Sequence, residues 1–134
     1  MKIHHLGYLV ENMDSAVRQF LEEGGKLKSR IYDEDRLVEI AFIEMERLPI
    51  ELVCPHEGSV DVGKSIRRLK TIPYHLCFEC RNLEEEINKR VKNGDMLVKE
   101  PQKAVAIDNR NVAFMYNESI GLFELVEESE NERE

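Results

Sequence analysis

The sequence predicts an α+β fold made of two tandem βαβββ modules, together forming one domain over residues 1–127. Three observations lead to this prediction. Apolar residues alternate with a period of two in several short runs, as strands require, and recur every three to four residues in two longer runs, as helices require. A strand followed by a helix occurs twice along the chain. The second occurrence aligns with the first without a gap.

The first module is expected to cover residues 1–60. It begins with a strand over 3–10, after which Asn12 stands where a helix N-cap is favoured. Helically spaced apolar residues over 13–23 end at Gly24, a typical C-terminal stop. The other strands of this module are expected at 27–32, 37–44 and 49–54.

A connecting helix is expected over 61–72, and the second module over 73–127. This module opens with the strand "YHLCFEC", and Asn82 with Glu85 then forms a pattern like a capping box. The helix ends at Gly94. Further strands are expected at 96–99, 111–116 and 121–127. The nearly all-polar residues 128–134 predict a solvated, disordered, acidic tail.

The repeat is the most informative feature of the sequence. The segment "HLGYLVENMDSAVRQFLEEG" aligns with "HLCFECRNLEEEINKRVKNG", placing His, Leu, Asn and Gly on identical residues. Farther along, "IAFIEMERLPIELV" resembles "VAFMYNESIGLFELV". A chance match is the alternative, because caps and core positions recur in all proteins. Repeats of this kind otherwise indicate duplicated structural units.

Composition excludes several classes of partner. The formal net charge of −8 argues against binding to nucleic acid or to an anionic membrane, since both require a basic surface. No apolar run approaches the roughly 18 residues of a membrane span, and the N-terminus lacks the features of a signal peptide. Three cysteines without a framework spacing suit a reducing compartment. A cytoplasmic protein with a small-molecule substrate is expected.

Successive side chains of a strand point to opposite faces, and this alternation, here called strand parity, singles out four residues. In "PIELV" and "LFELV", Glu51 and Glu124 lie on the strand face opposite the residues that pack on the helix. His5 and His75 take the same face in their strands. A single such residue is usually a solvated side chain on a half-covered sheet. Four at matched positions favour a shared role, and two imidazoles with two carboxylates suit a divalent transition metal if the open faces form one cleft.

Glu39 and the cysteine pair require separate interpretations. Because Glu39 is opposite in parity to Val38 and its apolar neighbours, we expect Glu39 to face the same cleft, with a solvated strand residue as the alternative. Cys77 and Cys80 have CxxC spacing, but an offset of three along a strand places them on opposite faces. Core thiols are therefore expected.

The chain resembles the vicinal oxygen chelate superfamily, which includes glyoxalase I (lactoylglutathione lyase), methylmalonyl-CoA epimerase, extradiol dioxygenases and antibiotic-resistance proteins. The segments "HHLGYLVENMDSAV", "PIELVCP", "YHLCFEC" and "GLFELVE" are similar, in this order, to the ligand strands of the epimerase and glyoxalase I branches. The resemblance implies a curved mixed sheet around a metal cleft. It also implies that the four matched positions bind one divalent ion, either Co, Ni, Mn or Zn. These positions are His5, Glu51, His75 and Glu124.

From this resemblance we expect a metal-dependent isomerase or lyase that moves a proton adjacent to a carbonyl, with Glu39 or Glu124 as the base. Its substrate would be an acyl thioester or a hemithioacetal, and a homodimer is expected. Lys64, Arg67 and Arg68 are candidates for binding substrate phosphates, although a solvated helix face is the simpler interpretation.

The reaction stays open between alternatives. The turn "NESIG" differs from that of glyoxalase I, and "MYNES" differs from the corresponding segment of epimerases. A reaction like that of methylmalonyl-CoA epimerase is preferred over the glyoxalase I reaction. The other alternative is a non-catalytic binding protein of the antibiotic-resistance type, which would normally lack a complete ligand set. An iron dioxygenase usually has two histidines and one carboxylate, so four ligands disfavour that class.

Overall fold

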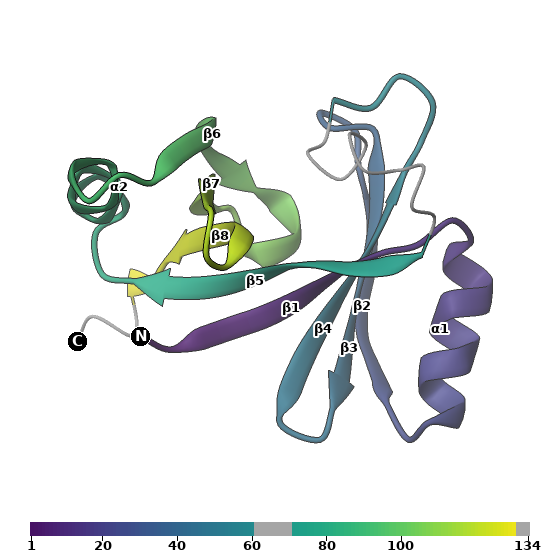
Figure 1. Cartoon of the computed structure of the whole chain (residues 1–134). Helices are drawn as coiled ribbons and strands as arrows, with labels where there is room; N and C mark the ends of the chain where they lie inside the picture. Colours follow the sequence, from purple (N-terminus) through teal and green to yellow (C-terminus); the bar gives the residue numbers. More distant parts are fainter. Residues whose placement is uncertain (61–70, 131–134) are drawn as a thin grey trace. The chain divides into compact units, whose positions relative to one another are not determined.

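The computed structural model describes residues 1–60 and 71–130 (Figure 1). The chain divides into two compact units, one made of Met1–His4 with His75–Glu134 and the other of His5–Tyr74. Most of the predicted connecting helix, including Lys64, Arg67 and Arg68, lies outside the described residues. So does the end of the predicted tail.

The first module contains four strands in the order β2-β3-β4-β1, with β1 and β4 parallel and the other neighbours antiparallel. Its helix packs on one face of these strands through a core that includes Val17, Ala41 and Leu52. The elements are β1 (Ile3–Leu9), α1 (Met13–Glu22), β2 (Lys26–Asp33), β3 (Val38–Met45) and β4 (Leu48–Pro55).

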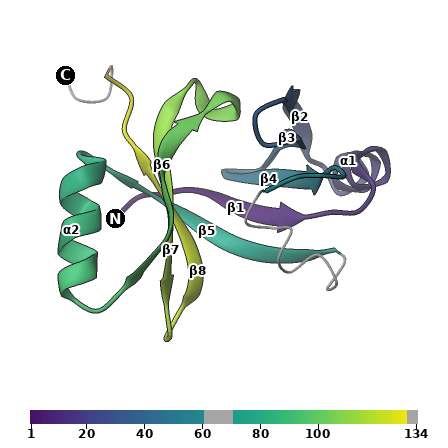
Figure 2. The same ribbon diagram turned by 90° about the horizontal axis from the view of Figure 1, so that it is seen from above.

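The second module repeats this arrangement, with the strand order β5-β8-β7-β6 and a parallel β5–β8 pair. Figures 1 and 2 show its helix alongside the strands of the same module. The elements are β5 (Ile72–Cys80), α2 (Leu83–Lys92), β6 (Met96–Ala104), the 3-10 turn η2 (Val105–Ile107), β7 (Arg110–Asn117) and β8 (Gly121–Glu127). The predicted fold class of two tandem βαβββ modules is confirmed.

Both helices begin and end in the same way. The side chain of Asn12 accepts a hydrogen bond from the Ser15 amide at 2.9 Å, and Asn82 accepts one from the Glu85 amide at 3.0 Å. Gly24 and Gly94 follow the helices with φ of 97° and 102°, a left-handed conformation that glycine adopts without a steric penalty. The predicted helix boundaries are confirmed within about two residues at each end.

The ends of three predicted segments differ from expectation. The strand predicted at 96–99 continues to Ala104 as β6. Ile72, placed in the connecting helix, is the first residue of β5. The Glu128 amide donates to the Cys80 carbonyl at 2.8 Å, so the first residue of the predicted tail is held beside β5. A polar side chain does not prevent a backbone amide from extending the contacts of a strand. No helix in the described parts of the chain is long and apolar enough to span a membrane.

Candidate metal centre

His5 and Glu51 form a buried pair in the first module. Gly7 is the register partner of Glu51 in the parallel β1–β4 pair, so His5, two residues away, shares its face. The Nε2 atom of His5 lies 3.4 Å from Oε1 of Glu51. Their exposed fractions are only 0% and 6%. Both residues therefore lie on the face that strand parity predicted.

His75 and Glu124 form the equivalent pair in the second module. Cys77 is the register partner of Glu124 in the parallel β5–β8 pair, and His75 again lies two residues away on the same face. The distance from His75 Nε2 to Glu124 Oε1 is 3.2 Å, and both side chains are buried. The two modules thus carry the same pair at matched positions of their equivalent strands.

Each pair fits the donor geometry of a divalent metal. Nitrogen and oxygen ligands lie about 2.1 Å from a transition ion, so two ligands at 90–110° around one ion are about 3.0–3.4 Å apart. The two measured distances are 3.4 and 3.2 Å. A buried carboxylate must be paired or bind a metal, because an isolated charge costs too much to bury. One imidazole and one carboxylate in each pair are suitable donors for Zn, Co, Ni or Mn.

Phe42 and Phe114 also belong to these two clusters, although sequence parity alone did not single them out. Phe42 is the register partner of Glu51 in the antiparallel β3–β4 ladder, and Phe114 is the partner of Glu124 in β7–β8. The two rings contact His5 and His75, respectively. The alignment of "IAFIEMERLPIELV" with "VAFMYNESIGLFELV" contained this signal, because it places one phenylalanine over the other.

Glu39 lies on the opposite face of its strand, contrary to our expectation. Ala41, which has the same parity, packs beneath α1, whereas Phe42 lies on the face of Glu51. Glu39 Oε2 accepts a hydrogen bond from Arg30 Nε at 2.6 Å, and Arg30 also donates to Asp14 in the first turn of α1. The prediction failed because both faces of β3 are apolar and partly buried, so alternation did not distinguish them.

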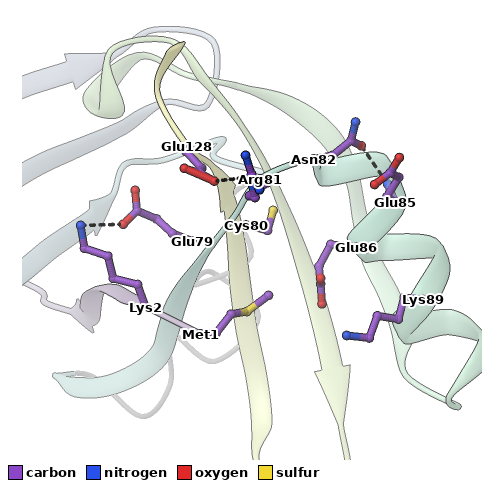
Figure 3. Close-up of a pocket in the computed structure, with 10 residues that line it drawn as sticks. All are labelled: Met1, Lys2, Glu79, Cys80, Arg81, Asn82, Glu85, Glu86, Lys89 and Glu128. Atoms are coloured by element: carbon purple, nitrogen blue, oxygen red, sulfur yellow. Dashed lines mark hydrogen bonds and ion pairs between the residues drawn. The ribbon is translucent and has the colours of Figure 1, made fainter. Parts of the chain in front are cut away.

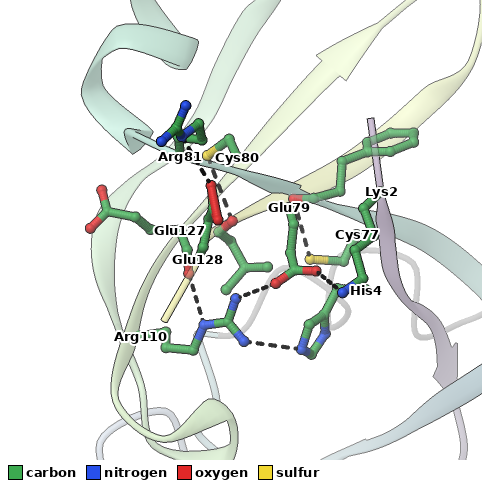
Figure 4. A network of polar contacts seen from close by, with 11 residues as sticks. Lys2, His4, Cys77, Glu79, Cys80, Arg81, Arg110, Glu127 and Glu128 are labelled. Carbon is green, nitrogen blue, oxygen red and sulfur yellow. Dashed lines mark hydrogen bonds and ion pairs between the residues drawn. The ribbon is translucent and has the colours of Figure 1, made fainter. Parts of the chain in front are cut away.

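An ion-pair network occupies another part of the face of β5 that carries His75 (Figure 4). Arg110 donates to Glu79 at 2.7 Å and to the Glu127 carbonyl at 2.8 Å, and its third nitrogen lies 3.4 Å from Nε2 of His4. Glu79 is buried, and Lys2 approaches it from the N-terminus at 3.5 Å. His4 is thus part of a polar network apart from the His75–Glu124 pair.

The cysteines take the faces that their spacing predicted. Cys80 belongs to the core beneath α2, and Cys77 points to the face of His75. Burial, followed by the nearby charges of Glu86 and Glu127, raises the pKa of Cys80 from 9.0 to about 12. Cys80 also lines a cavity of about 610 Å³ between the N-terminal residues and α2 (Figure 3). None of the predicted metal ligands lines this cavity.

Comparisons with known proteins agree with this architecture. The chain is similar in structure to a hypothetical protein from Bacillus halodurans, with 25% identity, coverage of 96% of this chain and 95% of that chain, and a TM-score of 0.84. It is similar to methylmalonyl-CoA epimerase from Mycobacterium tuberculosis, with 22% identity, coverage of 98% and 90%, and a TM-score of 0.80.

A third similar structure is a variant of the methylmalonyl-CoA epimerase of Streptomyces coelicolor in complex with 2-nitronate-propionyl-CoA. It is 18% identical, with coverage of 97% of this chain and 96% of that chain and a TM-score of 0.81. The comparison with curated proteins found no match. The model of one protein family matches residues 4–114, most of the chain. The chain therefore belongs to the glyoxalase/bleomycin resistance protein/dioxygenase superfamily.

Proposed function

We propose that this protein is a divalent-metal-dependent isomerase or lyase that moves a proton on a carbon adjacent to a carbonyl group, in a reaction like that of methylmalonyl-CoA epimerase. The observation that carries the proposal is the duplicated, buried His–Glu pair, with distances of 3.4 and 3.2 Å in the two modules. Duplication supports a shared role, because a solvated side chain has no reason to recur at the same place in both modules.

The proposed ligands of one divalent ion are the two pairs together. Each module would contribute one imidazole nitrogen and at least one carboxylate oxygen, which leaves coordination positions for water or for a substrate oxygen. Membership of the superfamily supports this assignment. The ligands in the proposal are His5, Glu51, His75 and Glu124.

Proton transfer is assigned to the chain's own carboxylates. A bound divalent ion would supply a Lewis acid that stabilises negative charge on the substrate carbonyl oxygen, an effect of several kcal/mol. Glu124 is proposed to accept the proton from the adjacent carbon and to return it to the same carbon or to the neighbouring carbon. Because β8 holds Glu124 buried against His75, its carboxylate has little freedom to move away from that position.

A lyase reaction of the glyoxalase I type is the second candidate, and the position of Glu39 favours it. A separate base would have to lie on the face of the His–Glu pair, but Glu39 is bound to Arg30 on the helix side of β3. Of the two predicted bases, Glu124 is therefore the one that remains. A reaction in which a ligand carboxylate also transfers the proton is compatible with this arrangement. A non-catalytic binding protein would not need the complete donor set.

The substrate class rests on the similar structures. Two of the similar proteins are named methylmalonyl-CoA epimerases, and one of these structures contains an acyl-CoA compound. An acyl thioester is thus the first proposed substrate and a hemithioacetal the second. Lys64, Arg67 and Arg68 remain proposed contacts for substrate phosphates. A homodimer and a cytoplasmic location complete the proposal.

The metal is tested by elemental analysis of purified protein after equilibration with Co, Ni, Mn or Zn. About one ion per chain is expected, and the double variant Glu51→Ala, Glu124→Ala should lose it. Glu44→Ala with Glu100→Ala is the matched control, because it removes one strand carboxylate from each module outside the pairs. Absence of a stoichiometric ion, or equal binding by both double variants, would overturn the metal assignment.

The reaction is tested by incorporation of solvent deuterium adjacent to the carbonyl, over a panel of acyl-CoA thioesters and hemithioacetals. Exchange in a thioester with retention of its carbon skeleton supports the epimerase-like reaction. Conversion of a hemithioacetal to a 2-hydroxy thioester supports the glyoxalase-type reaction. Metal binding without exchange in any compound would favour the binding protein.

A further inference from the structure

We propose that Phe42 and Phe114 are positioning residues for the two histidine ligands, one in each module, and that metal affinity depends on their aromatic rings. This inference rests on the proposed metal binding. It goes beyond that proposal because neither phenylalanine is a metal donor and neither was predicted as a site residue.

In the first module, the His5 ring contacts both an aromatic ring and a carboxylate. Its centroid is 5.5 Å from that of Phe42, with an interplanar angle of 84°, an edge-to-face arrangement. Its Nε2 atom is 3.4 Å from Glu51. Phe42 and Glu51 are register partners on neighbouring strands. Their side chains therefore leave the sheet side by side on the face of His5.

The second module repeats this arrangement. The centroids of His75 and Phe114 are 5.1 Å apart at an interplanar angle of 81°, and Nε2 of His75 is 3.2 Å from Glu124. Phe114 and Glu124 are again register partners in an antiparallel ladder. Each module thus has the same three side chains in a similar geometry.

The repetition is selective, and this argues that the rings have a role. At two other positions on the same face the chemistry changes between the modules, although Val53 and Val126 are identical. Module one has Leu9 and Val38 where module two has Glu79 and Arg110. The phenylalanine is kept where the histidine and the glutamate are kept. A requirement for general apolar packing alone would be met by any aliphatic side chain, as it is at Val38.

A physical reason follows from the torsions of histidine. The χ2 angle of histidine has a broad, roughly two-fold distribution, so the backbone alone does not set the direction of the ring nitrogens. An edge-to-face contact prefers one orientation of the imidazole, because the electrostatic quadrupole of the phenylalanine favours a particular approach. The ring of Phe42 or Phe114 would therefore hold Nε2 toward the carboxylate before the metal binds. Without that ring, part of the binding free energy would be spent on ordering the imidazole.

The experiment measures Co²⁺ and Zn²⁺ dissociation constants of the full chain by competition with a chelator, together with the visible absorption spectrum of bound Co²⁺. Phe42→Leu and Phe114→Leu keep an apolar side chain but remove the ring. Each should weaken binding by about threefold to tenfold, with a changed Co²⁺ spectrum. Phe42→Tyr keeps the ring on a partly exposed position and should retain the wild-type affinity.

Phe123→Leu and Phe20→Leu are the matched controls. Phe123 is adjacent to Glu124 in the chain but packs on Phe78 on the helix side, and Phe20 packs on Tyr8. These controls should lower the urea midpoint and leave the metal dissociation constants within about twofold, the expected reproducibility when no ligand contact changes. If Phe114→Leu does not fold, Phe42→Leu still tests the inference in the other module.

The outcomes separate this inference from the proposed function. A wild-type protein without stoichiometric metal binding would overturn the metal assignment and the positioning role with it. A wild-type protein that binds metal, with unchanged affinity in Phe42→Leu and Phe114→Leu, would overturn the positioning role alone. So would an equal loss of affinity in the controls, because affinity would then follow fold stability.

Discussion

The Nε atom of Arg30 lies 2.6 Å from Oε2 of Glu39 on the helix side of β3. A second nitrogen of Arg30 lies 2.6 Å from Asp14, in the first turn of α1. The hydrogen bonds to Glu39 and then to Asp14 raise the pKa of Arg30 above its ordinary value. Arg30 therefore stays charged, and Glu39 has a structural partner instead of a place beside the His–Glu pair.

Substitution of the two predicted bases should have unequal effects. Glu124→Gln should lower the rate of solvent-deuterium exchange by about 10²-fold or more, the usual contribution of a positioned base. Glu39→Gln should leave that rate nearly unchanged, with a loss of at most about 1 kcal/mol in the free energy of unfolding, as for other partly exposed ion pairs. Exchange kinetics and urea unfolding measure both. A large rate loss in Glu39→Gln with normal stability would contradict the structural assignment.

Arg110→Ala should strongly destabilise the protein. It would leave the carboxylate of Glu79 buried without the guanidinium that lies 2.7 Å away, and removing one partner of a buried pair typically costs about 3–5 kcal/mol. The double variant Glu79→Leu, Arg110→Val should lose much less, because Leu9 and Val38 occupy the corresponding positions of module one. Urea unfolding of both variants provides the measurement. Similar losses in the two variants would indicate that the pair has no unfavourable desolvation to relieve.

The buried thiol of Cys80 should make stability depend on alkaline pH. Its pKa is about 12 in the folded protein, against an ordinary value of 9.0. Between these values the unfolded chain loses the proton and the folded chain keeps it, so the free energy of unfolding should fall as pH rises from about 9 to 12. Urea midpoints at pH 8, 9 and 10 should decline more in the wild type than in Cys80→Ala. Parallel declines would show that other groups cause the dependence.

The matched helix caps should contribute equally. Asn12→Ala and Asn82→Ala each remove a side-chain acceptor for an amide in the first turn, at 2.9 and 3.0 Å. Each substitution should lower the free energy of unfolding by about 0.5–2 kcal/mol. Asn12→Asp and Asn82→Asp retain the acceptor and should recover most of the loss. Failure of the aspartate variants to recover it would indicate that the cap contact has little energetic weight.

Strand parity correctly predicted the face on which the four proposed ligands lie, because the alternation of side chains is a local property of an extended backbone. Leu6 and Tyr8 pack on the core beneath α1, which leaves His5 on the other face. The same method failed for Glu39 because β3 has another strand on either side and buries residues on both faces. Where both faces are apolar, the sequence pattern does not indicate which one the helix covers.

The sequence by itself determined the duplicated modules, the helix caps and stops, and the parity of the four proposed ligands, since each depends on residues close together in the chain. Tertiary structure alone decided which side chains stand across from those ligands. The register between β3 and β4 places Phe42 opposite Glu51, and the register between β7 and β8 places Phe114 opposite Glu124. Register depends on how whole strands pack against each other and against a helix. A one-residue shift in the register of a strand would turn all of its side chains to the other face.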